Sequence, residues 1–332
     1  MEQLWPVYHS SIPQFLLDFS AAPAVRRLRQ VGMNCGCEYT SFPRFAGLGP
    51  YSRYDHSLGV ALIVWHFTHD KAQAVAGLLH DVATPVFAHV VDFLNGDFLR
   101  QESTEALTEA VIARSDEIQS LLHRHGMTTA AVSDYHRYPI ADNDSPRLSA
   151  DRLEYTLGNL VNFGFCPLDI AADFYRDLVV GSNESGEPEL SFRSPDLACR
   201  FALDALRCSR VYVSDEDRFS MMALADLLRG ALGRGVLTES DLGTTEPAVI
   251  AKLRTDKASR DAWENFTKYS GLTVSDVPAE GTPCYRVAAK KRFIDPLIAG
   301  GGRASQYSQE VASALSDFQN RSFACWIAGR RA

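Results

Sequence analysis

The sequence predicts an all-α fold with minor β hairpin content. Apolar residues recur at helical spacing in several segments, whereas segments rich in β-branched and aromatic residues are few and short. The chain has 332 residues, of which 46% are hydrophobic and 22% are charged, a composition typical of globular proteins. A chain of this length buries a large core without help from disulfides.

Five segments have the length and apolar spacing of helices: residues 57–67, 72–79, 101–122, 149–161 and 220–232. Within residues 101–122, for example, Val111, Ile118 and Leu122 lie seven and four residues apart, which places them on one helical face. The last segment precedes a Gly-Arg-Gly sequence, a signal for a helix end. These segments predict the helical body of the protein.

Two shorter segments favour strands. Residues 189–192 follow a turn-forming stretch at residues 183–188, and residues 284–294 have β-branched and aromatic members. We expect two parts: residues 1–165, a lead-in and a helical core, and residues 166–332, a helical C-terminal extension with short strands packed on that core.

Composition excludes several classes of protein. The formal net charge is −8, from 33 basic and 41 acidic side chains, which makes nucleic acid an unlikely partner. No stretch approaches the ~20 apolar residues that span a bilayer, and the first residues lack the pattern of a secretory signal. Seven irregularly spaced cysteines indicate a reducing compartment. We therefore expect a cytoplasmic protein without a membrane partner.

Four potential metal ligands lie at the ends of the predicted helices. His80 and Asp81 close an apolar helix, and burying this adjacent pair is costly unless it is ion-paired or binds a cation. His56 begins the preceding helix, and Asp151 lies near the start of a later one. Two imidazoles and two carboxylates form a mixed nitrogen and oxygen site that suits Mn, Fe, Co, Ni, Zn or Mg. The alternative is a set of core histidines and a helix-capping carboxylate.

The motifs around these ligands resemble those of the HD-domain metal-dependent phosphohydrolase superfamily. Residues 53–60 (RYDHSLGV) and 77–89 (GLLHDVATPVFAH) are nearest to dGTP triphosphohydrolases and sterile-α-motif HD-domain dNTP triphosphohydrolases. The resemblance covers about residues 27–159. It implies an HD-domain helical core, a divalent metal held by the four ligands, and a metal-activated water as the nucleophile.

The resemblance also implies which residues bind the substrate. Arg53 matches a phosphate-contacting arginine, and Arg152 stands where relatives have a lysine on the α-phosphate. Tyr155 matches a tyrosine that packs on the sugar, and Asn159 replaces an aspartate that binds the 3′-hydroxyl. Gln30 resembles a glutamine that lines the sugar.

Departures from the family pattern concern the proton that the leaving group needs. Thr84 replaces a histidine proposed to protonate the leaving oxygen, and we place it among the substrate-binding residues. Gln101 replaces a second family histidine. Glu102 and His89 remain as candidate acid–base residues, with His136 as a further one. We therefore predict hydrolysis of a phosphoester in a nucleotide or similar small phosphorylated metabolite.

Three alternatives stay open. The first is a dNTP triphosphohydrolase proper. The second is a mixed-valent di-iron HD oxygenase, for which His123, His125 and His136 offer further iron ligands. The third is a nucleotide-sensing HD module without turnover. Relatives form oligomers, and the apolar segment 220–232 is compatible with a homo-oligomer.

Overall fold

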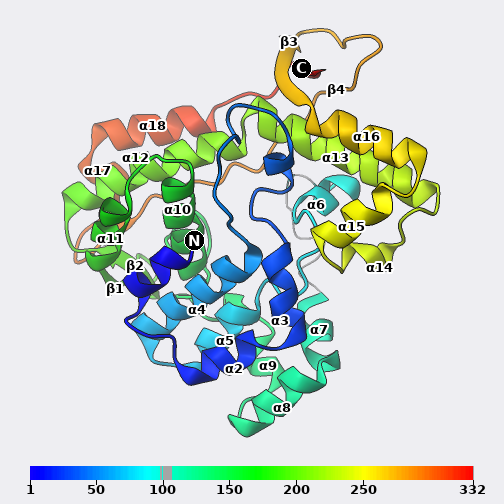
Figure 1. Ribbon diagram of the computed structural model, residues 1–332. Coiled ribbons are helices and arrows are strands. Elements are labelled where there is room, and N and C mark those ends of the chain that lie inside the picture. The colour runs from blue at the N-terminus through cyan, green and yellow to red at the C-terminus, as the bar shows by residue number, and fades with distance from the viewer. Residues whose placement is uncertain (98, 100–106, 332) are drawn as a thin grey trace.

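Helices dominate the computed structural model, which describes residues 1–97, 99 and 107–331 (Figure 1). In the described part of the chain the strands form two small three-stranded sheets. The predicted fold class, mainly α with minor β content, is therefore confirmed. None of the described helices combines the length and the apolar composition that crossing a bilayer requires.

The first half of the chain contains α1 (Trp5–Tyr8), α2 (Gln14–Ser20), α3 (Pro23–Arg26), α4 (Arg53–Thr68), α5 (Lys71–Leu79), α6 (Val90–Leu94), α7 (Thr108–Arg114), α8 (Asp116–Arg124), α9 (Thr129–Val132) and α10 (Ala150–Asn162). The second half contains α11 (Leu168–Arg176), α12 (Pro195–Tyr212), α13 (Asp215–Gly233), α14 (Glu239–Leu242), α15 (Glu246–Leu253), α16 (Lys257–Thr267), α17 (Ala304–Tyr307) and α18 (Gln309–Gln319). Four of the five predicted helices are thus confirmed as α4, α5, α10 and α13.

The predicted single helix over residues 101–122 is wrong. The described part of that segment forms two helices, α7 and α8, which meet at Ser115. Ser115 has extended backbone angles, φ −89° and ψ 106°, and its side chain accepts a hydrogen bond from the amide of Ile118. A serine that caps a new helix in this way breaks the old one, although the apolar spacing continues across the break.

The first sheet has the order β1-β2-β5, with β1 (Leu178–Ser182), β2 (Pro188–Phe192) and β5 (Leu297–Ile298). Strands β1 and β2 form an antiparallel hairpin, and β2 confirms the strand predicted at residues 189–192. The second sheet has the order β3-β6-β4, with β3 (Tyr269–Ser275), β4 (Cys284–Tyr285) and β6 (Trp326–Arg331).

The strand predicted over residues 284–294 is wrong beyond Tyr285. Only Cys284 and Tyr285 pair with β6, and residues 286–296 have no regular structure. Val287 and Ile294 are buried in two different hydrophobic clusters. Because the segment fills the space between two cores, its apolar residues are explained by packing and not by a β ladder.

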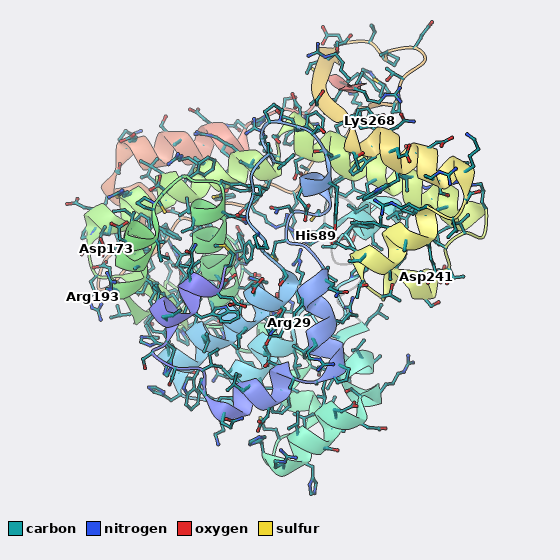
Figure 2. The ribbon with its side chains drawn as sticks, in the orientation of Figure 1. Arg29, His89, Asp173, Arg193, Asp241 and Lys268 are labelled. Carbon is teal, nitrogen blue, oxygen red and sulfur yellow. The ribbon has the colours of Figure 1, made fainter. Side chains whose placement is uncertain are left out.

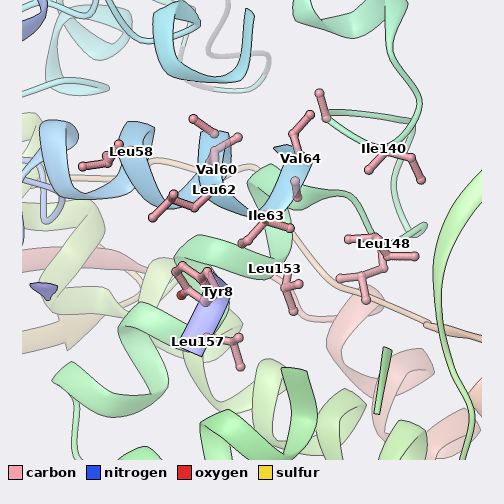
Figure 3. Close-up of a cluster of buried hydrophobic side chains, with 14 of the residues drawn as sticks. Tyr8, Leu58, Val60, Leu62, Ile63, Val64, Ile140, Leu148, Leu153 and Leu157 are labelled. Atoms are coloured by element: carbon pink, nitrogen blue, oxygen red, sulfur yellow. The ribbon is translucent and has the colours of Figure 1, made fainter. Parts of the chain in front are cut away.

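Helix α4 lies at the centre of the larger cluster. Figure 3 shows Leu58, Leu62 and Ile63 among the buried side chains of α4, with Leu153 and Leu157 of α10 in the same cluster. A second cluster is built around α13 and includes side chains of α6. Both clusters combine side chains from before and after residue 165. The predicted C-terminal extension therefore shares its core with the first half of the chain.

The turn between α4 and α5 brings the end of α5 next to the start of α4. Asp70 caps α5 by accepting hydrogen bonds from the amides of Ala72 and Gln73, and His69 ends α4 in the left-handed conformation, with φ 52°. The two helices pack closely against each other. As a result the residue after α5, His80, lies beside His56 in the first turn of α4, with 5.1 Å between ring centroids.

Candidate metal centre and its cavity

Three of the predicted metal ligands converge on one point. His56 comes from the first turn of α4, His80 follows α5, and Asp151 lies in the first turn of α10. Asp151 Oδ1 lies 3.0 Å from His56 Nε2 and 3.6 Å from His80 Nε2. One ligand atom from each residue lies within 4.8 Å of the other two. This spacing suits three ligands of a single cation.

The outer hydrogen bonds of both imidazoles fit a metal site. His56 Nδ1 lies 2.6 Å from Glu154 Oε2, and His80 Nδ1 lies 2.7 Å from the carbonyl oxygen of Gly77. These partners are acceptors, so Nδ1 carries a proton in each ring and Nε2 is the nitrogen that faces Asp151. A lone pair facing a carboxylate oxygen is repulsive unless a proton or a cation lies between them. The donor set therefore fits a divalent metal ion.

Asp81 lies beside these three ligands. Its Oδ2 is 3.6 Å from His80 Nε2 and accepts a hydrogen bond from Arg53 at 3.0 Å. Its Oδ1 accepts a hydrogen bond from the Thr84 hydroxyl at 2.6 Å. Burial raises the pKa of Asp81, but the charges of Arg53 and His80 outweigh burial and hold it well below its usual range. Asp81 is therefore an oriented carboxylate next to the three converging ligands.

Electrostatics couple His56 and Asp151. Burial lowers the pKa of His56, but its hydrogen bonds to Asp151 and Glu154 outweigh burial and raise it to about 10. Burial raises the pKa of Asp151, but the hydrogen bond from His56 dominates and lowers it to about 2. The pair holds a positive charge at Nε2 tightly, and a bound cation would take the place of that proton.

The site opens into a cavity of about 620 Å³, within the size range of sites for small organic ligands. Most of the predicted site residues line this cavity: His56, His80, Asp81, His89, Asp151, Arg53, Arg152, Tyr155 and Asn159. Gln30 is exposed at the end of a 3₁₀ turn and is not among the lining residues. Thr84 is also not among them, and it contacts Asp81 instead. Glu102 lies outside the described residues.

The two predicted phosphate-binding arginines each have a carboxylate partner. Arg53 pairs with Asp81 at 3.0 Å. Arg152 pairs with Asp142 at 3.1 Å and also donates to the backbone and side chain of Asn143. Both guanidinium groups are therefore held in fixed positions in the cavity wall.

His89, labelled in Figure 2, is half-buried and lines the cavity. Its Nδ1 is 2.9 Å from Asp92 Oδ2, and its Nε2 is 3.4 Å from a guanidinium nitrogen of Arg292. Burial lowers the pKa of His89 to about 4. The hydrogen bond to Asp92 raises this pKa, but burial has the larger effect. The imidazole is therefore neutral near pH 7, with Nδ1–H donating to Asp92 and Nε2 accepting from Arg292.

Three further features complete the site, and the sequence had already indicated His136 among them but not Glu154. Glu154, which holds His56, lies three residues after Asp151, a spacing that places both on one helical face. His136 lines the cavity and its Nδ1 is 2.7 Å from Asp142. Residues 290–293 line the same cavity, although they lie more than 130 residues after Asp151 in the sequence. For these last residues the basic run Lys290–Arg292 was a signal, but only tertiary contacts bring it to the site.

Of the three histidines considered as further iron ligands, only His136 lines the cavity. His123 is exposed at the end of α8. His125 packs near the rings of Phe15 and Phe19. The cavity therefore offers one of the three, and the other two lie outside it.

The chain matches no family model. Its sequence is similar to the uncharacterized protein YdhJ of Bacillus subtilis, with 28% identity over 248 residues that cover 74% of each protein. It is also similar to a protein of Cordyceps militaris named metal-dependent phosphohydrolase cns2, with 27% identity over 71% of this chain and 64% of that protein.

Two solved structures share the fold. One is a hypothetical protein from Aquifex aeolicus, with a TM-score of 0.64, 18% identity, and coverage of 96% of this chain and 93% of that one. The other is a phosphohydrolase from Bacteroides thetaiotaomicron, with a TM-score of 0.64, 14% identity, and coverage of 97% of each chain. The chain thus shares its whole fold with these two structures and is similar in sequence to a metal-dependent phosphohydrolase.

Proposed function

We propose that this protein is a metal-dependent phosphohydrolase that cleaves a phosphoester of a nucleotide or similar small phosphorylated metabolite. The convergence of His56, His80 and Asp151 on one point, with Asp81 beside them, carries this proposal. The phosphohydrolase names of a sequence relative and of a structural neighbour support it. Mn, Fe, Co, Ni, Zn and Mg all suit such a donor set.

A divalent metal in such a site activates a water molecule and polarises a phosphoryl oxygen. The protein supplies the geometry for this chemistry. Glu154 and the Gly77 carbonyl fix the two imidazoles so that both Nε2 atoms face the same point. Arg53 orients Asp81 and places a positive charge in the cavity wall, where it would attract a negatively charged phosphate.

Other groups in the cavity suit two further tasks. One is to bind the organic part of the substrate, and the other is to give a proton to the leaving group. Tyr155 and Asn159 line the cavity on α10, one and two turns beyond Asp151, and would contact a sugar-sized group. His136 is held by Asp142 and faces the same cavity, which makes it the described residue best placed to give a proton to the leaving oxygen. His89, as a neutral acceptor from Arg292, is better suited to positioning that arginine.

The test is a phosphate-release screen over nucleoside mono-, di- and triphosphates with several divalent metals, in which phosphate, pyrophosphate and triphosphate are measured separately. We expect His80→Ala and Asp151→Ala to abolish metal binding and turnover. His123→Ala changes an exposed histidine outside the cavity and serves as the control. Full turnover in either ligand variant would refute the proposal.

The screen also separates the alternatives. Release of triphosphate from a dNTP identifies a dNTP triphosphohydrolase proper. Nucleotide binding that survives in Asp81→Ala, with no product from either protein, identifies a sensing module. Oxygen uptake by the iron-loaded protein identifies an oxygenase, which the placement of His123 and His125 outside the cavity disfavours.

A homo-oligomer is part of the same proposal, because the relatives that the sequence resembles assemble in this way. The helix first considered for this contact, α13, has Leu224 and Leu228 buried in the second cluster. Sedimentation of the purified protein is the direct measurement of its oligomeric state.

A further inference from the structure

The cavity is lined by side chains of both hydrophobic clusters. The candidate metal ligands come from α4, α10 and the turn after α5, which contribute to the larger cluster. Asp217 also lines the cavity, and it lies in the first turn of α13, one turn before Met221 on the same helical face. We define the Asp217 compartment as this aspartate together with the lining residues that belong to the second cluster: Cys35, Phe45, Val211 and Met221.

The loop before α4 holds one oxygen of Asp217. The 3₁₀ turn Cys37–Tyr39 packs on α13, and the fully buried thiol of Cys37 donates to Asp217 Oδ1 at 3.7 Å. Burial raises the pKa of this thiol, so it keeps the proton that it donates. Cys35 has the left-handed backbone conformation, with φ 53°. Such a conformation is maintained only where the surrounding structure enforces it, so this part of the cavity wall is fixed.

The other oxygen of Asp217 is buried without a partner. The residue is only 9% exposed, and its Oδ2 has no hydrogen-bond partner among the residues that the structure describes. None of the ion pairs within that part of the chain includes Asp217, and the neighbouring Arg218 pairs with Asp215 instead. A buried polar atom without a partner is costly. Because Asp217 belongs to the cavity wall, a ligand in the cavity is the partner that remains.

Helix capping does not account for Asp217. An acidic residue three positions after the N-cap commonly accepts a hydrogen bond from the N-cap amide, and Asp55 in α4 and Asp241 in α14 do so. The N-cap of α13 is Ser214, whose amide donates to the carbonyl oxygen of Val211. The Asp217 carboxyl is thus left to the cavity wall instead of the helix end.

Burial keeps the Asp217 carboxyl neutral near pH 7. It has the largest effect and raises the pKa to about 8, although the hydrogen bond from Cys37 and the two nearby arginines lower it. The titratable and charged groups around the carboxyl are Cys37, Arg292, Arg218, Glu216 and Cys35. With Oδ1 accepting from the thiol, Oδ2 carries the proton and is a hydrogen-bond donor.

The rest of the Asp217 compartment favours a flat ring. It offers a thiol, an aromatic ring, a branched aliphatic side chain and a thioether, from Cys35, Phe45, Val211 and Met221. Sulfur and aromatic groups pack favourably against aromatic rings. The several hydroxyl groups of a sugar would lose water against this wall without gaining partners. An apolar wall with one donor suits an uncharged ring that carries an acceptor.

Helix α10 leads from the metal ligands toward this compartment. Asn159 lies two turns after Asp151, about 12 Å along the helix axis at 1.5 Å per residue. Its side-chain amide donates to the Tyr212 hydroxyl at 2.7 Å, and Tyr212 directly follows Val211 of the compartment. A substrate with its phosphate at the metal centre and its ring in the compartment therefore has room for a sugar-sized group between them.

We propose that the Asp217 compartment binds an uncharged heteroaromatic ring of the substrate, and that the Asp217 carboxyl selects this ring by donating a hydrogen bond to a ring nitrogen or a ring carbonyl oxygen. The inference rests on the proposed function and narrows its substrate to phosphorylated metabolites that carry such a ring. Asp217 is then a specificity-determining residue, and it lies outside the segment that resembles the HD-domain superfamily.

The test uses two probes without phosphate, purine riboside and indole riboside, in excess Mg²⁺. Both have the same bicyclic shape, but indole riboside has no ring nitrogen free to accept a hydrogen bond. NMR titration measures their affinities. We expect Asp217→Leu, which keeps the shape of the side chain, to weaken purine riboside binding about tenfold, the effect of one lost hydrogen bond. Indole riboside binding should change less than about twofold.

Asp217→Asn keeps a donor at the same place, so it should retain most of the affinity for purine riboside. In the parent protein this affinity should fall as the pH rises above about 8 and the carboxyl ionises, whereas in Asp217→Asn it should not. Glu216→Gln is the matched control, because Glu216 is the neighbouring acid, pairs with Arg44 at 3.2 Å and is not among the lining residues. It should leave both affinities unchanged.

Four outcomes overturn the inference: no binding of purine riboside at millimolar concentration, unchanged binding in Asp217→Leu, an equal loss for both probes, or identical pH profiles for the parent protein and Asp217→Asn. If thermal unfolding shows that Asp217→Leu does not fold, the two pH profiles decide. Neither probe carries a phosphate to be released. The result therefore stands apart from the phosphate-release screen, and the two proposals fail independently.

Discussion

Glu154 is the residue that fixes His56, one of the candidate metal ligands. Its carboxylate is completely buried and accepts hydrogen bonds from His56 at 2.6 Å and from the Tyr51 hydroxyl at 2.5 Å. A carboxylate in this position sets the tautomer of the imidazole and raises its basicity. The coordinating power of His56 therefore depends on a side chain that does not itself face the metal point.

We expect Glu154→Gln to reduce the affinity for divalent metal by roughly ten- to a hundredfold, because the amide lacks the charge that stabilises the imidazole. Metal titration followed by calorimetry measures the effect. Tyr51→Phe removes one hydrogen bond to Glu154 and keeps the charge of the Glu154 carboxylate, so the loss of metal affinity should be smaller. An equal or larger loss in Tyr51→Phe contradicts the role given to the charge.

Asp217 tests the effect of burial on a single carboxyl. Burial raises its pKa to about 8, and the charged or titratable groups around it are Cys37, Arg292, Arg218 and Glu216. In the unfolded chain an aspartate titrates near pH ~4. Between these values the unfolded chain has released the proton and the folded chain retains it. The free energy of unfolding therefore falls as the pH rises from about 4 to about 8.

Asp217→Asn removes this dependence, since the amide is the same shape and does not titrate. We expect the variant to gain stability relative to the parent protein as the pH rises across that range. Urea unfolding at several pH values between about 5 and 8 measures the difference. Parallel pH profiles for the two proteins would show that Asp217 is ionised in the folded state.

At the scale of the elements, the contact between α4 and α10 brings His56 to Asp151. It depends on Gly59, where an added Cβ would lie 2.6 Å from Glu154 Cγ and from Glu154 Oε1. Gly158 serves α10 in the same way, because a Cβ there would lie 2.4 Å from the Tyr51 hydroxyl oxygen. Both glycines thus make room for the buried Tyr51–Glu154–His56 chain of hydrogen bonds.

Gly59→Ala should destabilise the protein by about 1–3 kcal/mol, the usual cost of overpacking, although alanine favours a helix by about 1 kcal/mol. Because Glu154 must move, metal affinity should fall as well. Gly233→Ala is the control, since Gly233 ends α13 with nothing within 4 Å of an added Cβ. Chemical unfolding and metal titration of both variants check this, and a stabilised Gly59→Ala contradicts the packing argument.

At the scale of the whole molecule, the proposed metal would join three elements. Its candidate ligands come from α4, α10 and the turn after α5, which all contribute to the larger hydrophobic cluster. A ligand that binds only the folded state stabilises it by RT ln(1 + [L]/Kd), about 2.7 kcal/mol at a hundredfold excess over Kd.

We therefore expect a saturating divalent metal to raise the melting temperature by a few degrees and a chelator to reverse the rise. His80→Ala and Asp151→Ala should show no response to metal, whereas His123→Ala should respond like the parent protein. Differential scanning calorimetry measures these shifts. A metal response that persists in both ligand variants places the binding site elsewhere.

Prediction from the sequence was most successful where information is local. The helices α4, α5, α10 and α13 follow from the apolar spacing within each segment. The break at Ser115 was missed, because the apolar spacing continues through it and only the backbone geometry reveals the second cap.

The sequence alone determined the helical class, the candidate ligands His56, His80, Asp81 and Asp151, and the arginines beside them, because each motif is contained within a few consecutive residues. The tertiary structure decided which of these groups share a cavity. It placed Gln30 outside the lining and committed Thr84 to Asp81. It also brought in residues 290–293, which lie more than 130 residues after Asp151. Such long-range contacts depend on how two hydrophobic clusters pack around α4 and α13, and no local pattern encodes that packing.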